Sequence, residues 1–191
     1  MYSVQNALAA AAVCREVGIS LERIAETLNH TKGVKGRSEI IDTGRDFSVI
    51  CDYAHTPDGL KNILPSIKKF TKGRLITLFG CGGNRDAGKR PIMGEVAAEY
   101  SDFLIVTSDN PRLEDPIAII NDILPGVKKH QTEYVVVPNR KEAIFYAVQH
   151  AQPDDVVVLA GKGHENYQVL GNEKVHFDER EIVREALATL S

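Results

Sequence analysis

The sequence predicts an α/β protein with a Rossmann-like, mostly parallel sheet and helices on both faces, preceded by a short helical remnant of a neighbouring domain. From residue 47 onward, short continuous apolar runs alternate with helical patterns, which is typical of parallel strands buried on both faces. The chain has 191 residues, of which 43% are hydrophobic and 26% charged, enough for one domain with a proper core. The first thirty residues, by contrast, show helical spacing alone.

Charge and cysteine content exclude several classes of protein. The 26 acidic and 23 basic residues give a net charge of -3 without a basic block, which argues against nucleic-acid and membrane partners. The three cysteines form no C-x-x-C pair and are expected to be reduced intracellular thiols, with neither a disulfide framework nor a zinc site. Neither a secretory signal nor an apolar run of about 20 residues is present. We therefore expect a cytoplasmic protein.

The first two predicted helices carry apolar stripes that they cannot bury by themselves. Gly18 is a natural end for the first helix, and Ser20 caps the second. The chain also opens abruptly, without a capping residue. Residues 1–34 are therefore expected to come from the edge of a preceding domain, with a linker from Thr31 to Ser38 that contains two glycines. The apolar stripes consist of Leu8, Ala9, Ala12, Val13 and Val17, and of Leu21, Ile24, Ala25 and Leu28.

A second domain is predicted over residues 35–191. It begins with a hairpin in which residues 39–43 and 47–51 flank a Gly-Arg-Asp turn, and it ends with a second hairpin near residues 169–175 and a helix capped by Asp178. Between them, Thr56 and Pro57 begin the first of several helices. The remaining expected elements are strands at 74–79, 103–107, 134–137 and 156–160, and helices at 57–70, 91–100, 116–124 and 140–151.

Four unusual loops follow predicted strands. Because ligands of such sheets lie beyond the carboxyl ends of the strands, these loops are expected to converge at one edge. Their sequences are DYAHTPD (52–58), GCGGNRD (80–86), SDNPR (108–112) and GKGHE (161–165).

The glycine-rich loop at 80–86 resembles a phosphate cradle, but it matches neither the dinucleotide fingerprint nor the P-loop. Its glycines could instead let Arg85 approach a ligand, or form only a tight turn with solvated charges. In the next loop, Pro111 fixes the backbone between Asn110 and Arg112, so that an amide and a guanidinium are presented together. The alternative there is an Asx-turn that opens the following helix.

The GKGHE loop adds a carboxylate to this edge. Glu165 could bind an ammonium group, whereas His55 and His164 lack the spacing of a metal site and are more typical of capping or hydrogen-bonding histidines. Arginines for a carboxylate and Glu165 for an ammonium suit a zwitterion. The charges therefore predict an amino acid as the ligand.

These four motifs, in this order, resemble the Mur ligase family, and most closely its meso-diaminopimelate-adding members. The resemblance extends to SVQNALAA at 3–10, which is similar to the end of the family's central ATPase domain, and to KGRSE at 35–39, which is similar to its interdomain linker. It implies that residues 1–34 are C-terminal helices of that ATPase domain plus linker, and that residues 35–191 are the amino-acid-binding domain.

The resemblance also implies an activity in peptidoglycan biosynthesis. Family members use ATP and magnesium to phosphorylate the terminal carboxylate of UDP-N-acetylmuramoyl-L-alanyl-D-glutamate, and the amine of diaminopimelate then attacks the acyl phosphate. The P-loop and catalytic lysine of the family lie in the central domain. Since no P-loop occurs here, the chain is expected to lack catalytic residues and to be inactive alone.

Family residues can be carried over position by position. Asp109 and Pro111 shape the DNPR loop, and its arginine marks diaminopimelate over lysine because it meets the distal carboxylate. Ser3 stands where the family usually has an asparagine. The implied diaminopimelate contacts are Arg85, Asp109, Asn110, Pro111, Arg112, Gly161 and Glu165, and the implied nucleotide contacts are Asn6, Arg37, Asp52 and His55.

Two other functions fit the sequence less well. A free-standing, non-catalytic module that binds an amino acid or a nucleotide would not begin within a helix whose apolar stripe needs a partner. A dinucleotide-dependent reductase would need the glycine fingerprint that is missing here.

Overall fold

The computed structural model describes residues 2–31 and 33–190, which divide into two compact units between Val34 and Lys35. The first unit holds α1 (Tyr2–Glu16) and α2 (Leu21–His30). Ser20 caps α2 as predicted, because its Oγ accepts a hydrogen bond from the Arg23 N–H at 3.3 Å.

The apolar stripe of α1 is open to solvent. Leu8 and Val13 are each 65% exposed, and Val17 is 72% exposed. A helix with such a face is stabilised mainly by packing of that face against a partner. That the first unit belongs to a neighbouring domain remains a proposal.

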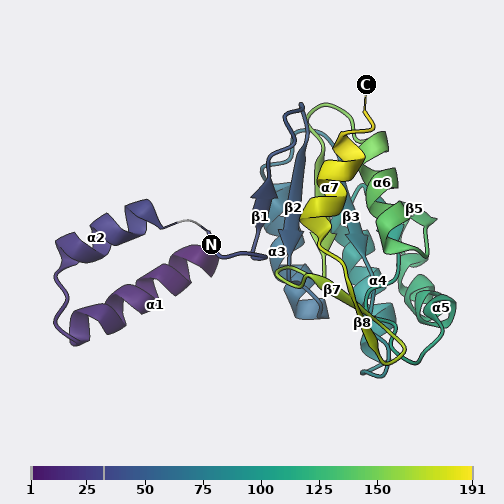
Figure 1. The fold of residues 1–191 in the computed structure, drawn as a ribbon, viewed down its shortest axis with the longest axis horizontal. Helices are drawn as coiled ribbons and strands as arrows, with labels where there is room; N and C mark the ends of the chain where they lie inside the picture. The colour runs from purple at the N-terminus through teal and green to yellow at the C-terminus, as the bar shows by residue number, and fades with distance from the viewer. Residues whose placement is uncertain (1, 32, 191) are drawn as a thin grey trace. The chain divides into compact units, whose positions relative to one another are not determined.

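The second unit is built on a six-stranded sheet (Figure 1) with the order β1-β2-β6-β3-β4-β5. β1 and β2 are antiparallel, which confirms the first predicted hairpin, and the other neighbours are parallel. The sheet is therefore mostly parallel, as predicted. The strands are β1 (Glu39–Ile41), β2 (Ser48–Asp52), β3 (Leu75–Phe79), β4 (Phe103–Val106), β5 (Glu133–Val136) and β6 (Val156–Ala160).

Helices cover both faces of this sheet (Figure 1). α3 (Pro57–Lys68), α4 (Lys89–Tyr100) and α5 (Pro116–Val127) pack on one face, and α6 (Arg140–His150) and α7 (Glu179–Leu187) pack on the other. Phe79 belongs to the first core and its neighbour Leu78 to the second, and both are completely buried. Because successive side chains of a strand point to opposite faces, both must be apolar, which explains the continuous apolar runs.

Local hydrogen bonds explain where the elements begin. Thr56 Oγ1 accepts from the Gly59 N–H (3.0 Å) at the start of α3, and Asp178 Oδ1 accepts from the Arg180 N–H (3.0 Å) at the start of α7. The predicted late hairpin is present as an antiparallel pair of strands, β7 (Tyr167–Leu170) and β8 (Glu173–His176).

Several element boundaries differ from the prediction by one or two residues, and the end of α5 differs by three. The sequence predicts that the fifth helix stops before Pro125, but α5 continues to Val127. Gly126 packs so closely on α4 that a Cβ there would lie 1.8 Å from the Pro91 carbonyl oxygen. This close packing holds the last turn in place despite the proline. Over the described residues, no helix combines the length and apolarity that a bilayer crossing requires.

Candidate functional site

The four loops meet at the carboxyl edge of the main sheet. The Gly83 N–H donates to the Asn110 carbonyl (2.9 Å), which joins the loops after β3 and β4. The Gly161 N–H donates to the Asp52 carbonyl (3.0 Å), which joins the loops after β6 and β2. The structure thus confirms that these loops converge, because parallel neighbours end at the same edge.

Arg112 sits at the junction of two loops and the β7–β8 hairpin. Its φ of 55° lies in the left-handed region, which is unusual for an arginine. Two backbone hydrogen bonds hold it there: its N–H donates to the Val169 carbonyl (3.1 Å), and its carbonyl accepts from the Gly171 N–H (2.8 Å). The β7–β8 hairpin therefore fixes the backbone of Arg112, the residue predicted to recognise a carboxylate. The sequence did not predict this role for the hairpin.

The Arg112 guanidinium lies over the glycine-rich loop. Its Nη1 donates to the carbonyls of Gly83 (3.0 Å) and Asn110 (3.3 Å). A Cβ on Gly83 would lie 1.9 Å from the Pro111 carbonyl oxygen, so the close approach of the two loops requires glycine at this position. The arginine and both loops consequently form one connected unit.

Asn110 connects this unit to the GKGHE loop. Its Nδ2 donates to Glu165 Oε2 at 3.1 Å, while its backbone carbonyl accepts from Arg112. Lys162 lies between them, completely buried, with its Nζ 3.0 Å from Asn110 Oδ1 and 3.4 Å from Glu165 Oε2. The structure therefore brings Arg112, Asn110 and Glu165 together, and it adds Lys162, which sequence analysis passed over.

A buried ion pair supports these loops from below. Arg140 and Glu179 are both completely buried, and Arg140 Nε donates to Glu179 Oε1 at 2.9 Å. Arg140 also donates to the carbonyls of Ser108 (3.2 Å) and Ala160 (2.9 Å), at the ends of two central strands. Burial by itself would lower the pKa of Arg140, but the charges of Glu179 and Asp109 raise it overall. The guanidinium therefore remains charged and anchors both loops.

Asp109 and Gly161 line the inner side of the site. Asp109 is 8% exposed, and its Oδ1 has no hydrogen bond but lies 3.4 Å from Lys162 Nζ. Gly161 has φ of 120°, which favours glycine, and a Cβ there would lie 3.8 Å from the Asp109 carboxylate.

Arg85 lies at the outer edge of the glycine-rich loop and is exposed. The residue before it, Asn84, has φ of 51°, and its N–H and Oδ1 are hydrogen-bonded to Glu114 and Leu113, respectively. The loop is thus anchored to the segment that precedes α5, next to the position of Arg85.

Three of the predicted nucleotide contacts also lie in the second unit. Asp52 is 7% exposed, and its carboxylate accepts from the N–H groups of Ser38 (2.7 Å) and Ala54 (2.8 Å). The Arg37 guanidinium is exposed and lies 4.9 Å from the centre of the Tyr53 ring. His55 is exposed as well, with Nδ1 2.8 Å from the Tyr53 carbonyl. Asp52 therefore holds the loop after β2 in place, whereas the Arg37 guanidinium lies over the Tyr53 ring and is open to solvent.

The fourth predicted nucleotide contact, Asn6, lies on α1 in the first unit, where its side chain is exposed.

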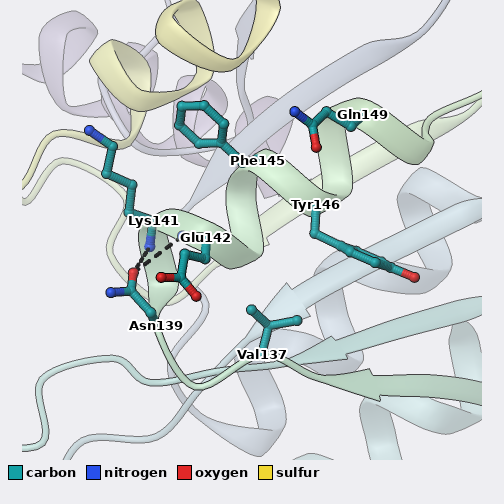
Figure 2. A pocket seen from close by; sticks show the side chains of 7 residues that line it. All are labelled: Val137, Asn139, Lys141, Glu142, Phe145, Tyr146 and Gln149. Atoms are coloured by element: carbon teal, nitrogen blue, oxygen red, sulfur yellow. Dashed lines mark hydrogen bonds between the residues drawn. The ribbon is translucent and has the colours of Figure 1, made fainter. Parts of the chain in front are cut away.

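Across the described ranges, no group of three or more histidine, cysteine or acidic side chains has the arrangement to hold a metal ion. A surface hollow of about 590 Å³ lies along α6 (Figure 2). It is lined by α6 and the segment before it, including Asn139, Phe145 and Tyr146, and by none of the four loops. The hydrogen-bonded charges gather at the loop cluster, so we place the candidate site there.

The chain is similar to known proteins over almost its whole length. The family model described as Mur ligase, glutamate ligase domain, matches residues 36–163. The chain is 56% identical over 188 residues to a UDP-N-acetylmuramoyl-L-alanyl-D-glutamate--2,6-diaminopimelate ligase of Caldanaerobacter subterraneus, and 48% identical over 186 residues to the ligase of that name from Geobacillus kaustophilus. These alignments cover 98% and 97% of this chain but 39% and 38% of the relatives, respectively, so the chain spans well under half of their length.

The chain is also similar in structure to solved ligases, again over part of their length. A structure of a UDP-N-acetylmuramoyl-L-alanyl-D-glutamate--2,6-diaminopimelate ligase has a TM-score of 0.78 and 37% identity, over 98% of this chain and 38% of that one. A UDP-N-acetylmuramate-alanine ligase from Thermotoga maritima has a TM-score of 0.67 at 21% identity, over 98% of this chain and 37% of that one, which shows a shared fold.

Proposed function

The chain belongs to the Mur ligase family, whose glutamate ligase domain it contains, and we propose that it is the amino-acid-binding part of an ATP-dependent ligase. In this proposal the ligase works in the cytoplasm and adds meso-diaminopimelate to UDP-N-acetylmuramoyl-L-alanyl-D-glutamate during peptidoglycan synthesis. Relatives between 48% and 56% identical carry the name of a ligase for 2,6-diaminopimelate. The observation that carries the proposal is the placement of Arg112 and Glu165 on neighbouring loops, joined through Asn110.

This placement suits one end of a diamino dicarboxylic acid. A guanidinium binds a carboxylate through two parallel hydrogen bonds, and a carboxylate binds an ammonium group. Arg112 therefore receives the distal carboxylate of diaminopimelate, and Glu165 receives the distal ammonium. In this proposal the exposed Arg85 binds the second carboxylate, and Asp109, Pro111 and Gly161 shape the wall of the site.

Some of the residues implied to contact ATP are accessible in this chain. ATP supplies the phosphoryl group that activates the acceptor carboxylate. The exposed guanidinium of Arg37 suits a phosphate, and His55 and Asn6 are exposed polar groups that a nucleotide could contact. Asp52 is engaged by two backbone N–H groups and positions the loop after β2. For magnesium, the described side chains offer no complete ligand set, so no step is assigned to that ion here.

The first unit is the remaining part of the proposal. Its exposed apolar stripe suits the C-terminal helices of the preceding ATPase domain, which would cover the stripe in the complete ligase. The UDP-muramoyl dipeptide and most of the ATP site would then be bound by domains outside this chain.

A fusion experiment tests the proposal. The first two domains of the Caldanaerobacter relative, joined to this chain, should convert the UDP-muramoyl dipeptide and diaminopimelate to the tripeptide with stoichiometric phosphate release. The 191-residue chain alone should release no phosphate from ATP, because its sequence contains no P-loop. A folded fusion that binds diaminopimelate but forms no product would favour a non-catalytic binding module instead.

A further inference from the structure

Lys162 holds its charge at the centre of the loop cluster, completely shielded from solvent. Its Nζ lies 2.8 Å from the Tyr167 carbonyl and 3.0 Å from Asn110 Oδ1. The carboxylates of Asp109 and Glu165 are both 3.4 Å away. An ammonium group has three N–H donors. The two short bonds engage two of them and Glu165 Oε2 accepts the third, while Asp109 Oδ1 contributes its charge without a hydrogen bond.

These contacts fix the orientation of the Asn110 amide. Asn110 Oδ1 accepts from Lys162 Nζ and from the Val169 N–H, which is also 3.0 Å away. An ammonium group and a backbone N–H can only donate, so the side-chain atom that faces them must be the oxygen. The Nδ2 group consequently faces Glu165 Oε2, to which it donates at 3.1 Å.

The same lysine also sets the position of the Glu165 carboxylate. Glu165 Oε2 receives Asn110 Nδ2 and lies beside Lys162, while the side chain remains 14% exposed. The carboxylate is thus held by Asn110 and Lys162, the Tyr167 hydroxyl lies beside it, and part of it is open to solvent. Asp109 and Glu165 together with Lys162 leave one net negative charge, which suits an incoming ammonium group.

We propose that Lys162 is a positioning residue for amino-acid recognition, which acts through Asn110 to hold the Glu165 carboxylate where it receives the distal ammonium group. The inference rests on the proposed function, because it takes diaminopimelate as the ligand. Lys162 itself touches no ligand, since it is completely enclosed.

The sign of the effect separates positioning from simple electrostatics. Removing a positive charge beside an ammonium site should strengthen binding if Lys162 acts only through its charge. Removing Lys162, which orients Asn110 together with the Val169 N–H and also contacts Glu165, should weaken binding. If Lys162 serves only the stability of the fold, its removal should weaken the binding of all ligands equally.

The test is a calorimetric titration of the 191-residue chain with meso-diaminopimelate and with L-2-aminopimelate, which keeps both carboxylates but lacks the distal amino group. The Lys162→Met variant should bind diaminopimelate roughly 10- to 100-fold more weakly, the range for loss of charge-assisted hydrogen bonds, and 2-aminopimelate within about threefold of the unaltered chain. Arg74→Met is the matched control. It removes a cation paired with the buried Asp155 at the opposite edge of the sheet and should change neither affinity.

Equal weakening for both ligands, unchanged binding or tighter binding of diaminopimelate would each overturn the inference. If the unaltered chain binds no diaminopimelate, the proposed function fails first and the inference fails with it. If Lys162→Met does not fold, NMR of the unaltered chain can test the orientation of the Asn110 amide on which the inference depends. The Asn110 side-chain NH₂ protons should show contacts to the Glu165 methylenes, and contacts to the Val169 N–H instead would overturn the inference.

Discussion

The Nη1 atom of Arg112 donates to the carbonyl oxygen of Gly83 at 3.0 Å, so the proposed specificity residue is anchored to the neighbouring loop. A second bond of 3.3 Å from the same nitrogen reaches the Asn110 carbonyl. Within the described residues, both hydrogen bonds of this guanidinium come from Nη1, which leaves Nη2 and Nε for a carboxylate. Selectivity would then depend on a fork that is positioned before the ligand arrives.

Arg112→Ala should weaken binding of diaminopimelate sharply and binding of lysine little. Lysine has hydrogen where diaminopimelate has its distal carboxylate, so only diaminopimelate loses a partner. Removing one member of such a pair typically costs roughly 2–5 kcal/mol, or about 30- to several-thousand-fold in affinity. Calorimetric titration of the variant with both amino acids measures this difference.

Two further variants serve as controls for that experiment. Arg112→Lys should restore binding only partly, because an ammonium group lacks the planar fork. Arg45→Ala removes an arginine from the turn between β1 and β2, at the opposite end of β2, and should leave both affinities unchanged. Equal losses for both amino acids in Arg112→Ala would mean that Arg112 holds a group that they share.

Gly83→Ala should disrupt the site without removing any of its charges. The added Cβ would lie 1.9 Å from the Pro111 carbonyl oxygen, so the loops must separate and the Arg112 contact must break. We expect diaminopimelate affinity to fall at least about tenfold and the free energy of unfolding to fall by roughly 1–3 kcal/mol. Gly33→Ala has open space around the new Cβ and is the control. Normal affinity in Gly83→Ala would show that the loop contact is dispensable.

Local chemistry made much of this fold predictable. The caps formed by Ser20, Thr56 and Asp178 depend on residues three or fewer positions away, and the structure confirms all three. The insertion of β6 between β2 and β3 could not be predicted in this way. That order depends on pairing between strands whose partners are 81 residues apart for β3 and β6 and 108 residues apart for β2 and β6, which no local pattern records.

The site residues that could be predicted are charged residues within sequence motifs. Those whose role depends on burial in the folded protein could not be predicted. Arg112 and Glu165 stood out as charged residues beside glycines and proline. Lys162 did not stand out, because a lysine is ordinarily expected to be solvated. Its burial depends on contacts with Asn110 and Tyr167, which the sequence does not show. The contact of Arg112 with the β7–β8 hairpin joins residues 57 and 59 positions apart, so it could not be predicted either.

Glu39 should make the free energy of unfolding of the second unit depend on pH. The hydrogen bond from Arg180 lowers the pKa of Glu39, helped by the Gly36 N–H and opposed by burial. Because the folded pKa lies below the unfolded value of about 4.3, this stabilisation is fully present above that pH and is lost as the pH falls through the folded pKa. Glu39→Gln should therefore be less stable by roughly 1–3 kcal/mol at pH 7, and the difference should shrink in acid.

Urea unfolding of both proteins between pH 7 and pH 2.5 measures this effect. Glu185→Gln, which removes an exposed partner of Lys141, should change stability by less than about 0.5 kcal/mol at pH 7. A difference between Glu39→Gln and the unaltered chain that is constant with pH would contradict the assignment.

Amide hydrogens of α1 and α2 should exchange faster than those of the central strands. The apolar face of α1 is exposed, so packing adds little to the stability of these helices. Hydrogen exchange followed by mass spectrometry should show early labelling at residues 4–30 and late labelling in β3 and β6. Equally slow exchange in both regions would mean that the two helices form a stable unit without a further partner.

The most direct test of the whole account is a calorimetric titration of the 191-residue chain, first with meso-diaminopimelate and then with L-lysine. If Arg112 and Glu165 form the site for a distal amino-acid end, diaminopimelate should bind with one site per chain. Lysine, which offers no distal carboxylate to Arg112, should bind about 30- to several-thousand-fold more weakly. Equal affinities for the two amino acids, or tighter binding of lysine, would contradict the account.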